Sequence, residues 1–189
     1  REDSTDIDDK KAIQSSDIPS IITIQSRIDN MLYSIEHHRA DSEGEERADQ
    51  DSFVVLTNMN QAVNFKLCVT SILKPSAENW VEVLPVSDRL YIEDVDVHST
   101  FWAISGREDG YENVWLVVMN PYTDFKSLSS SSRSLDLIKI PPRDSVYILS
   151  PGKNECYDTD SFRFIYESPT TPPLVCDYCI NGNQDGNGV

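Results

Sequence analysis

Short apolar segments separated by turn-forming residues are the feature that most limits how this chain can fold. Each is four to eight residues long, and several alternate apolar and polar side chains, as in Trp80-Val-Glu-Val-Leu84, which is typical of half-buried strands. Helical periodicity is almost absent, and the one helix candidate, residues 21–29, is rich in β-branched side chains. We therefore predict an all-β fold, with strands at 31–36, 52–57, 65–72, 80–84, 90–97, 102–106, 114–119, 135–140, 146–149, 162–167 and 174–180.

The turns between these segments carry the expected residues. Glu108-Asp109-Gly110 predicts a tight hairpin, because glycine adopts the positive φ that such a turn requires. Asn120-Pro121 and Ser150-Pro151-Gly152 are further breaks. Near the end of the chain, the sequence predicts a strand ending at Glu167, a turn rich in Pro and Thr up to Pro173, and a second strand.

The strands group into similar units of about fifty residues. Four strands span 31–84, four more span 90–140, and three span 146–180. Repeated four-stranded meanders are typical of propeller blades, whereas a β-sandwich would have a similar strand count without the repeat. We predict a partial β-propeller of about three antiparallel blades at 21–86, 87–142 and 143–189, the last incomplete, after an acidic flexible lead at 1–20.

Charge and hydropathy limit the possible partners. The net charge is −16, which argues against nucleic acid or an anionic membrane as a partner, since both require a positive surface. No apolar run approaches the ~20 residues of a membrane helix, and the acidic N-terminus does not resemble a signal peptide. The missing initiator Met suggests that the chain begins inside a longer reading frame.

The cysteine and calcium-like patterns do not predict a metal site. Cys176 and Cys179 are three apart on a predicted strand, so their side chains point to opposite faces. With Cys68 and Cys156 they are expected to be free thiols in a reducing cytoplasm. Asn181-x-Asn183-x-Asp185-Gly186 copies the first half of a calcium loop but lacks the glutamate at position twelve, which favours a plain turn. We expect no metal and no cofactor.

Catalytic residues are also not predicted. No glycine brackets a serine as G-x-S-x-G, the elbow of an α/β-hydrolase nucleophile. His37, His38 and His98 are expected to have structural or surface roles, and the adjacent His37 and His38 should point apart. The acidic groups Glu93-Asp94-x-Asp96 and Glu108-Asp109 are interpreted as strand-edge and loop acids, with attraction of basic peptides as a hypothesis.

An ordered series of motifs nevertheless resembles the prolyl oligopeptidase family of serine peptidases, most closely its oligopeptidase B branch. It begins with Tyr33-Ser-Ile-Glu-His-His-Arg39, Phe53-Val-Val-Leu-Thr-Asn58 and Ala62-Val-Asn-Phe-Lys-Leu67. It continues through Trp80, Ile92-Glu-Asp-Val95, Arg107-Glu-Asp-Gly110, Arg163, Thr170-Thr-Pro172 and Asp177-Tyr178. The resemblance covers residues 21–178.

This resemblance implies a serine-type endopeptidase in which a seven-bladed propeller covers an α/β-hydrolase domain. The propeller limits substrates to short peptides, cut after basic residues in the oligopeptidase B branch and after proline in the sister branch. The chain would be the last part of that propeller, packed against its own hydrolase domain and inactive alone. A stand-alone β-propeller-derived interaction module without peptidase activity is the second hypothesis. Under both hypotheses, neither nucleic acid nor a membrane is expected as a partner.

Overall fold

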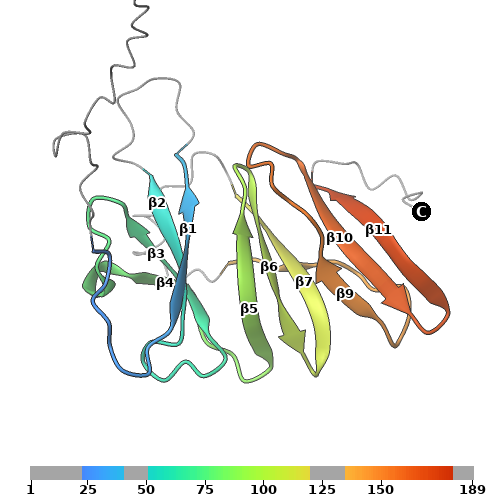
Figure 1. Ribbon diagram of the computed structural model, residues 1–189, viewed down its shortest axis with the longest axis horizontal. Helices are drawn as coiled ribbons and strands as arrows, with labels where there is room; N and C mark the ends of the chain where they lie inside the picture. The colour runs from blue at the N-terminus through green and yellow to red at the C-terminus, as the bar shows by residue number, and fades with distance from the viewer. Residues whose placement is uncertain (1–22, 41–50, 120–134, 181–189) are drawn as a thin grey trace, which may run out of the picture.

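The computed structural model describes residues 23–40, 51–119 and 135–180, which form three antiparallel sheets placed side by side (Figure 1). The described residues contain no α-helix and no helix that is long and apolar enough to cross a membrane. The strands are β1 (Tyr33–His38), β2 (Ser52–Thr57), β3 (Lys66–Ser71), β4 (Val81–Leu84), β5 (Leu90–Val97), β6 (Phe101–Glu108), β7 (Tyr111–Val118), β8 (Ile138–Lys139), β9 (Ile148–Pro151), β10 (Ser161–Ser168) and β11 (Thr171–Cys179).

Each sheet is a meander in which consecutive strands pair. The spatial orders are β1-β2-β3-β4, β5-β6-β7-β8 and β9-β10-β11. The three sheets therefore repeat one plan along the chain, as the sequence predicted. The predicted domain boundaries, including the lead at 1–20, stay a prediction, and residues 1–22 lie outside the described part.

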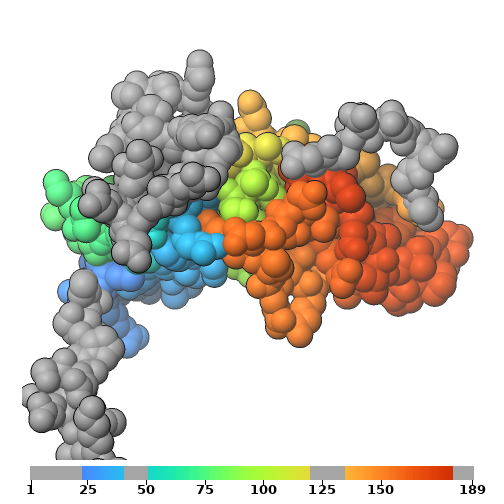
Figure 2. Space-filling view, turned by 90° about the horizontal axis from the view of Figure 1, so that it is seen from above, coloured from blue at the N-terminus to red at the C-terminus, as the bar shows by residue number. Residues whose placement is uncertain are grey.

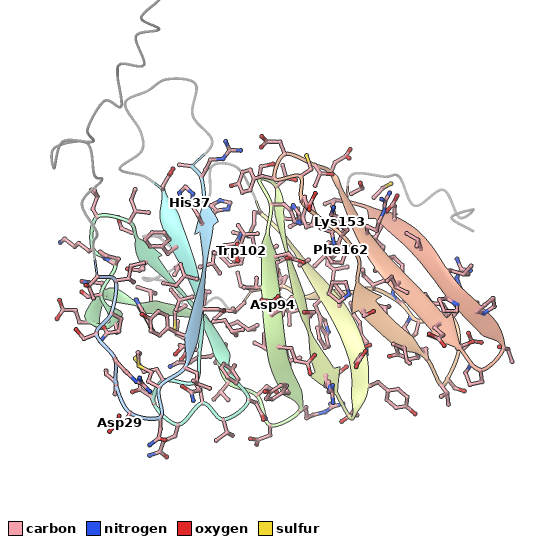
Figure 3. The ribbon with its side chains drawn as sticks, viewed as in Figure 1. Asp29, His37, Asp94, Trp102, Lys153 and Phe162 are labelled. Carbon is pink, nitrogen blue, oxygen red and sulfur yellow. The ribbon has the colours of Figure 1, made fainter. Side chains whose placement is uncertain are left out.

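The sheets pack face to face through two apolar layers. The first layer joins the first two sheets and includes Leu67 and Trp102. The second joins the other face of the second sheet to the third sheet through Phe101, Leu116 and Phe162. Figure 3 labels Phe162 in this layer and Trp102 in the first. Since the second sheet is covered on both faces, the molecule is a stack of blades and not a two-layer sandwich.

A β-bulge in β5 decides which side chains of this strand enter the core. The pairing with β6 shifts between Ile92 and Asp94, so that one residue of β5 is extra. The bulge changes the phase of the alternation, and Ile92, Val95 and Val97 are all buried. Without the bulge, strict alternation would place Ile92 on the same face as Asp94.

Glycine is required opposite this bulge. A Cβ at Gly106 would lie 2.1 Å from the carbonyl oxygen of Tyr91 and 3.1 Å from the Cα of Ile92. The strand partner of Gly106 is Ile92, so this close approach of two backbones leaves no room for a side chain.

The predicted hairpin at Glu108-Asp109-Gly110 is confirmed. β6 ends at Glu108 and β7 begins at Tyr111. The two residues between them have positive φ, 52° at Asp109 and 87° at Gly110. This is the left-handed backbone of a two-residue turn whose twist matches that of the flanking strands.

Several predicted strand ends were wrong, most clearly in the last hairpin. The strand expected from residue 174 begins at Thr171, so Pro172 and Pro173 lie inside β11. β11 has one partner, β10, in the described sheet, and an edge strand tolerates proline because some of its N–H groups need no partner. The strand predicted at 135–140 shortens to β8, and a 3-10 turn occupies Ala77–Asn79.

Candidate functional site

The site is built on the first strands of the first two sheets. β1 and β5 each form one edge of their sheet, and these two edges lie beside each other (Figure 1). Both strands have exposed side chains along the shared edge, whereas the strands behind them are largely buried. The edge is therefore a place where side chains far apart in the sequence meet on an accessible surface.

Three carboxylates meet at this edge: Glu36 on β1, and Asp94 and Asp96 on β5. We call them the edge carboxylates. Partial burial, followed by the nearby charges of Asp94 and Asp96, raises the pKa of Glu36. Burial and then the charge of Asp94 raise the pKa of Asp96. A carboxylate whose pKa is raised by neighbouring carboxylates lies in a concentrated negative field, which a cation would relieve.

The other acids singled out in the sequence lie elsewhere and are paired with cations. Glu93 bonds to Arg107 at 2.8 Å and Glu108 bonds to Lys139 at 2.9 Å. Asp109 lies at the tip of the β6–β7 hairpin and bonds to Arg89 at 2.8 Å, which lowers the pKa of Asp109. Of the acids singled out in the sequence, Glu93, Glu108 and Asp109 are thus in ion pairs. Asp94 and Asp96 lie near Glu36 instead.

The three histidines have different surroundings. His37 is exposed and bonds to Asp51 at 2.8 Å, whereas His38 points the other way and is buried, as expected for neighbours on a strand. The indole N–H of Trp102 donates to Nδ1 of His38 at 3.4 Å. His98 is also buried, and its Nδ1 donates to the carbonyl oxygen of Cys156 at 3.0 Å. The bonds described are to a carboxylate, an indole and a backbone carbonyl.

The cysteines are free, and their positions follow the strand alternation. Cys176 is half-buried and Cys179 is exposed on the same strand. Burial raises the pKa of the Cys68 thiol to about 11, which keeps it unreactive. Within the described ranges, no group of three or more His, Cys, Asp or Glu side chains is arranged to hold a metal ion. The calcium-like loop at 181–186 lies outside them.

Sequence reasoning missed Glu36 as a site residue. Its motif, Tyr33-Ser-Ile-Glu-His-His-Arg39, was used only for the resemblance. The repeat could have indicated Glu36, because β1 and β5 are the first strands of successive units and the first strands of adjacent blades lie side by side.

Comparison with known proteins supports the interpretation of the sheets as propeller blades. Residues 13–185 match the family "Prolyl oligopeptidase, N-terminal beta-propeller domain". Among curated proteins, dipeptidyl aminopeptidase BI of Pseudoxanthomonas mexicana is 24% identical over 131 residues, which are 69% of this chain and 16% of that protein.

Among solved structures, oligopeptidase B from Trypanosoma brucei, with covalently bound antipain, is 26% identical with a TM-score of 0.63. It matches 81% of this chain and 19% of its own. Oligopeptidase B from Leishmania major shares the fold at 19% identity and a TM-score of 0.63, matching 79% of this chain and 19% of its own. The chain thus spans about a fifth of these relatives' length.

The family match covers nearly all of the sequence, and its propeller architecture agrees with the three stacked meanders and with the solved structures. The chain therefore belongs to the family of prolyl oligopeptidase N-terminal β-propeller domains.

Proposed function

We propose that this chain is the substrate-gating propeller segment of a serine-type oligopeptidase that hydrolyses short peptides after Arg or Lys. In this proposal, an α/β-hydrolase domain beyond the present sequence carries the nucleophile and packs against the propeller. The propeller limits access to peptides that are short and unfolded. Family membership supports the peptidase link, and the four free thiols favour a cytoplasmic location.

One observation carries the preference for basic peptides: the edge carboxylates Glu36, Asp94 and Asp96. Each lies on the first strand of a sheet, and the pKa values of Glu36 and Asp96 are raised by burial and by neighbouring carboxylates. A peptide with a Lys or Arg side chain would relieve this repulsion as it passes. Long-range attraction of that kind acts mainly on the association rate and weakens as salt rises.

The test compares two charge reversals in the peptidase that contains this segment. Asp94→Lys changes the edge carboxylates, and Asp109→Lys changes an exposed acid at a hairpin tip. We expect Asp94→Lys to lower kcat/KM for Arg-type fluorogenic dipeptides several-fold at low salt, and much less at about 0.5 M salt. Asp109→Lys should leave it nearly unchanged. Equal kcat/KM for wild type and Asp94→Lys at low salt would refute the steering role.

The second candidate function is a stand-alone interaction module. It would need only the stacked propeller blades that the described residues form. A peptidase assay on this chain and on the longer natural product, with Arg- and Pro-type substrates, separates the two. Activity only in the longer product supports the peptidase. Activity in neither supports the interaction module.

A further inference from the structure

One end of the first sheet, together with the start of β5, exposes several large apolar side chains. At this end β1, β3 and β5 begin and β2 and β4 end, and it is the lower end in Figure 1. Its exposed apolar residues are Leu32, Tyr33, Val63, Val86 and Tyr91. At the opposite end of these strands, the described residues expose one large apolar side chain, Leu73. We call the lower end, formed by residues 28–33, 58–65 and 85–87 with Tyr91, the braced end.

Val63 has the most exposed large apolar side chain among the described residues, at 76%. It lies in the loop between β2 and β3. Two residues further along this loop, Phe65 packs edge-to-face on Tyr91 of β5, at 5.9 Å between ring centres. The apolar surface therefore continues from the first sheet to the second. A contiguous exposed apolar patch marks an interaction site.

Asn58 joins two loops of the braced end. Its Oδ1 accepts a hydrogen bond from the N–H of Leu32 at 2.8 Å, and its Nδ2 donates to the carbonyl of Asn30 at 3.0 Å. The hydroxyl of Thr57 also donates to the carbonyl of Leu32, at 2.9 Å. The exposed Leu32 side chain is therefore held on a fixed backbone.

Asn64 joins the next pair of loops. Its Nδ2 donates to the carbonyl of Ser87 at 2.7 Å, and its own carbonyl accepts from the N–H of Ile92 at 3.1 Å. These bonds connect the loop that carries Val63 to the loop that carries Val86. The apolar side chains of the braced end therefore lie on loops that need no ordering when a partner binds, which favours association.

Backbone strain is concentrated at the same end. Four of the five non-glycine residues with positive φ in the described ranges lie there, namely Asn30, Asn60, Gln61 and Phe65, while Asp109 belongs to the tight β6–β7 turn. Asparagine adopts this region readily, whereas it is unfavourable for Gln61 and Phe65, at 63° each. Residues strained in this way cluster at functional sites. The strain and the exposed apolar surface are independent observations, and both indicate this end of the molecule.

The opposite end is covered by the chain itself. The loop 152–160 between β9 and β10 reaches from the third sheet to the first, where the N–H of Arg39 donates to the Tyr157 hydroxyl at 2.9 Å. It also contacts the turn after β5, where the N–H of Ser99 donates to the carbonyl of Tyr157 at 3.1 Å. Figure 2, seen from above, shows the orange atoms of this region lying against the cyan atoms of the first sheet. The described residues leave the apolar side chains of the braced end uncovered.

The hydrolase domain of the proposed peptidase is the partner that fits this surface. The matching family consists of N-terminal propeller domains, and the matched region is 19% of each solved oligopeptidase B chain, so these relatives carry a large further part. A domain of the same protein covers an apolar surface permanently, as in obligate interfaces. A second copy of this chain fits less well, because two copies with a net charge of −16 each repel one another.

We propose that the braced end is the surface on which the α/β-hydrolase domain docks, with Val63 inserted into an apolar depression of that domain. This assignment rests on the proposed function. The hydrogen bonds of Asn58 and Asn64 keep the docking loops in one shape, so that they fix the position of the hydrolase domain relative to the blades.

Amide hydrogen exchange of the peptidase that contains this segment tests the docking surface. Val63→Asp places a charge in the proposed apolar contact, and we expect the protection of the amides in 58–65 and 85–87 to fall about tenfold or more. The matched control is Leu73→Asp, which changes another exposed apolar loop residue at the opposite end and should leave this protection nearly unchanged. The paired amides of β2 and β3 should keep their protection in both variants, which shows that the segment remains folded.

Two exchange results would overturn the proposal. One is equal protection of residues 58–65 in wild type and Val63→Asp. The other is protection that disappears on dilution as a dimer dissociates, because the occupant would then be a second copy. If Val63→Asp does not fold, the wild-type protein decides: Tyr91, which is 39% exposed in this segment, should resist nitration by tetranitromethane in the longer protein. Ready nitration of Tyr91 would refute the docking surface.

A fluorogenic peptidase assay on the same samples separates this proposal from the proposed function. Peptidase activity together with an unprotected braced end would overturn the docking surface and leave the proposed function standing. A protected braced end without activity on Arg- or Pro-type substrates would keep the docking surface and refute the proposed activity.

Discussion

Phe162 offers the sharpest test of the face-to-face packing. Its side chain is fully buried between the second and third sheets, edge-to-face with Phe101 at 6.4 Å between ring centres. Replacing it by alanine removes an aromatic ring from a closed layer, which costs the transfer free energy and leaves a cavity. We expect the free energy of unfolding to fall by about 4 kcal/mol.

Urea denaturation followed by circular dichroism measures this loss. With a slope of about 2 kcal/mol per molar urea, the midpoint should fall by about 2 M. The matched control is Ile165→Ala on the same strand, whose side chain faces away from the layer and is 36% exposed. It should cost about 1 kcal/mol. Equal losses for both variants would refute the packing of the third sheet on the second through this face.

Three further predictions test local features of the fold by denaturation. Gly106→Ala should lower the free energy of unfolding by about 3 kcal/mol, because the added Cβ meets the backbone of Tyr91. Gly110→Ala, which has open space around it, should lower it by only about 1 kcal/mol because of the positive φ. Equal losses would contradict the close approach at the bulge. Glu82→Gln should cost about 2 kcal/mol, since Lys66, whose side chain is 9% exposed, loses the carboxylate 2.7 Å away. Arg163→Gln, at an exposed ion pair, should destabilise the protein much less; a larger loss for Arg163→Gln than for Glu82→Gln would refute this reasoning. Burial and the charge of Asp94 raise the pKa of Asp96, so the ionised Asp96 opposes folding once the pH exceeds the pKa of this carboxyl in the unfolded chain. Asp96→Asn should therefore be more stable than wild type at neutral pH and equally stable in acid, below that unfolded-state pKa. Lower stability of Asp96→Asn at neutral pH would contradict this sign.

The strands and the tight hairpin could be predicted because their causes are local. Alternation in Trp80-Val-Glu-Val-Leu84 and the positive φ of Gly110 depend on neighbours in the sequence. The strand ends were less predictable, as the early start of β11 at Thr171 shows. There the pairing with β10, and not the propensity of proline, decides where the strand begins.

The candidate site depended on contacts that no local pattern contains. Glu36 lies near Asp94 and Asp96 only because the edge strands β1 and β5 lie side by side. Asp109 is not near these carboxylates, because it lies at the tip of the β6–β7 hairpin and bonds to Arg89. The bulge in β5 also explains the need for glycine at Gly106, because Gly106 on β6 pairs with Ile92 beside the bulge and no local pattern in either strand contains this contact.

The sequence by itself determined an all-β chain of repeated meanders, because strand alternation and turn residues act over a few residues and their order along the chain shows the repeat. It also carried the family motifs. Only the tertiary structure decided which acids meet, which histidine is buried beside Trp102, and that the loop at 152–160 joins the first and third sheets. Arg39 and Tyr157 are 118 residues apart, and contacts over such distances depend on how whole sheets stack.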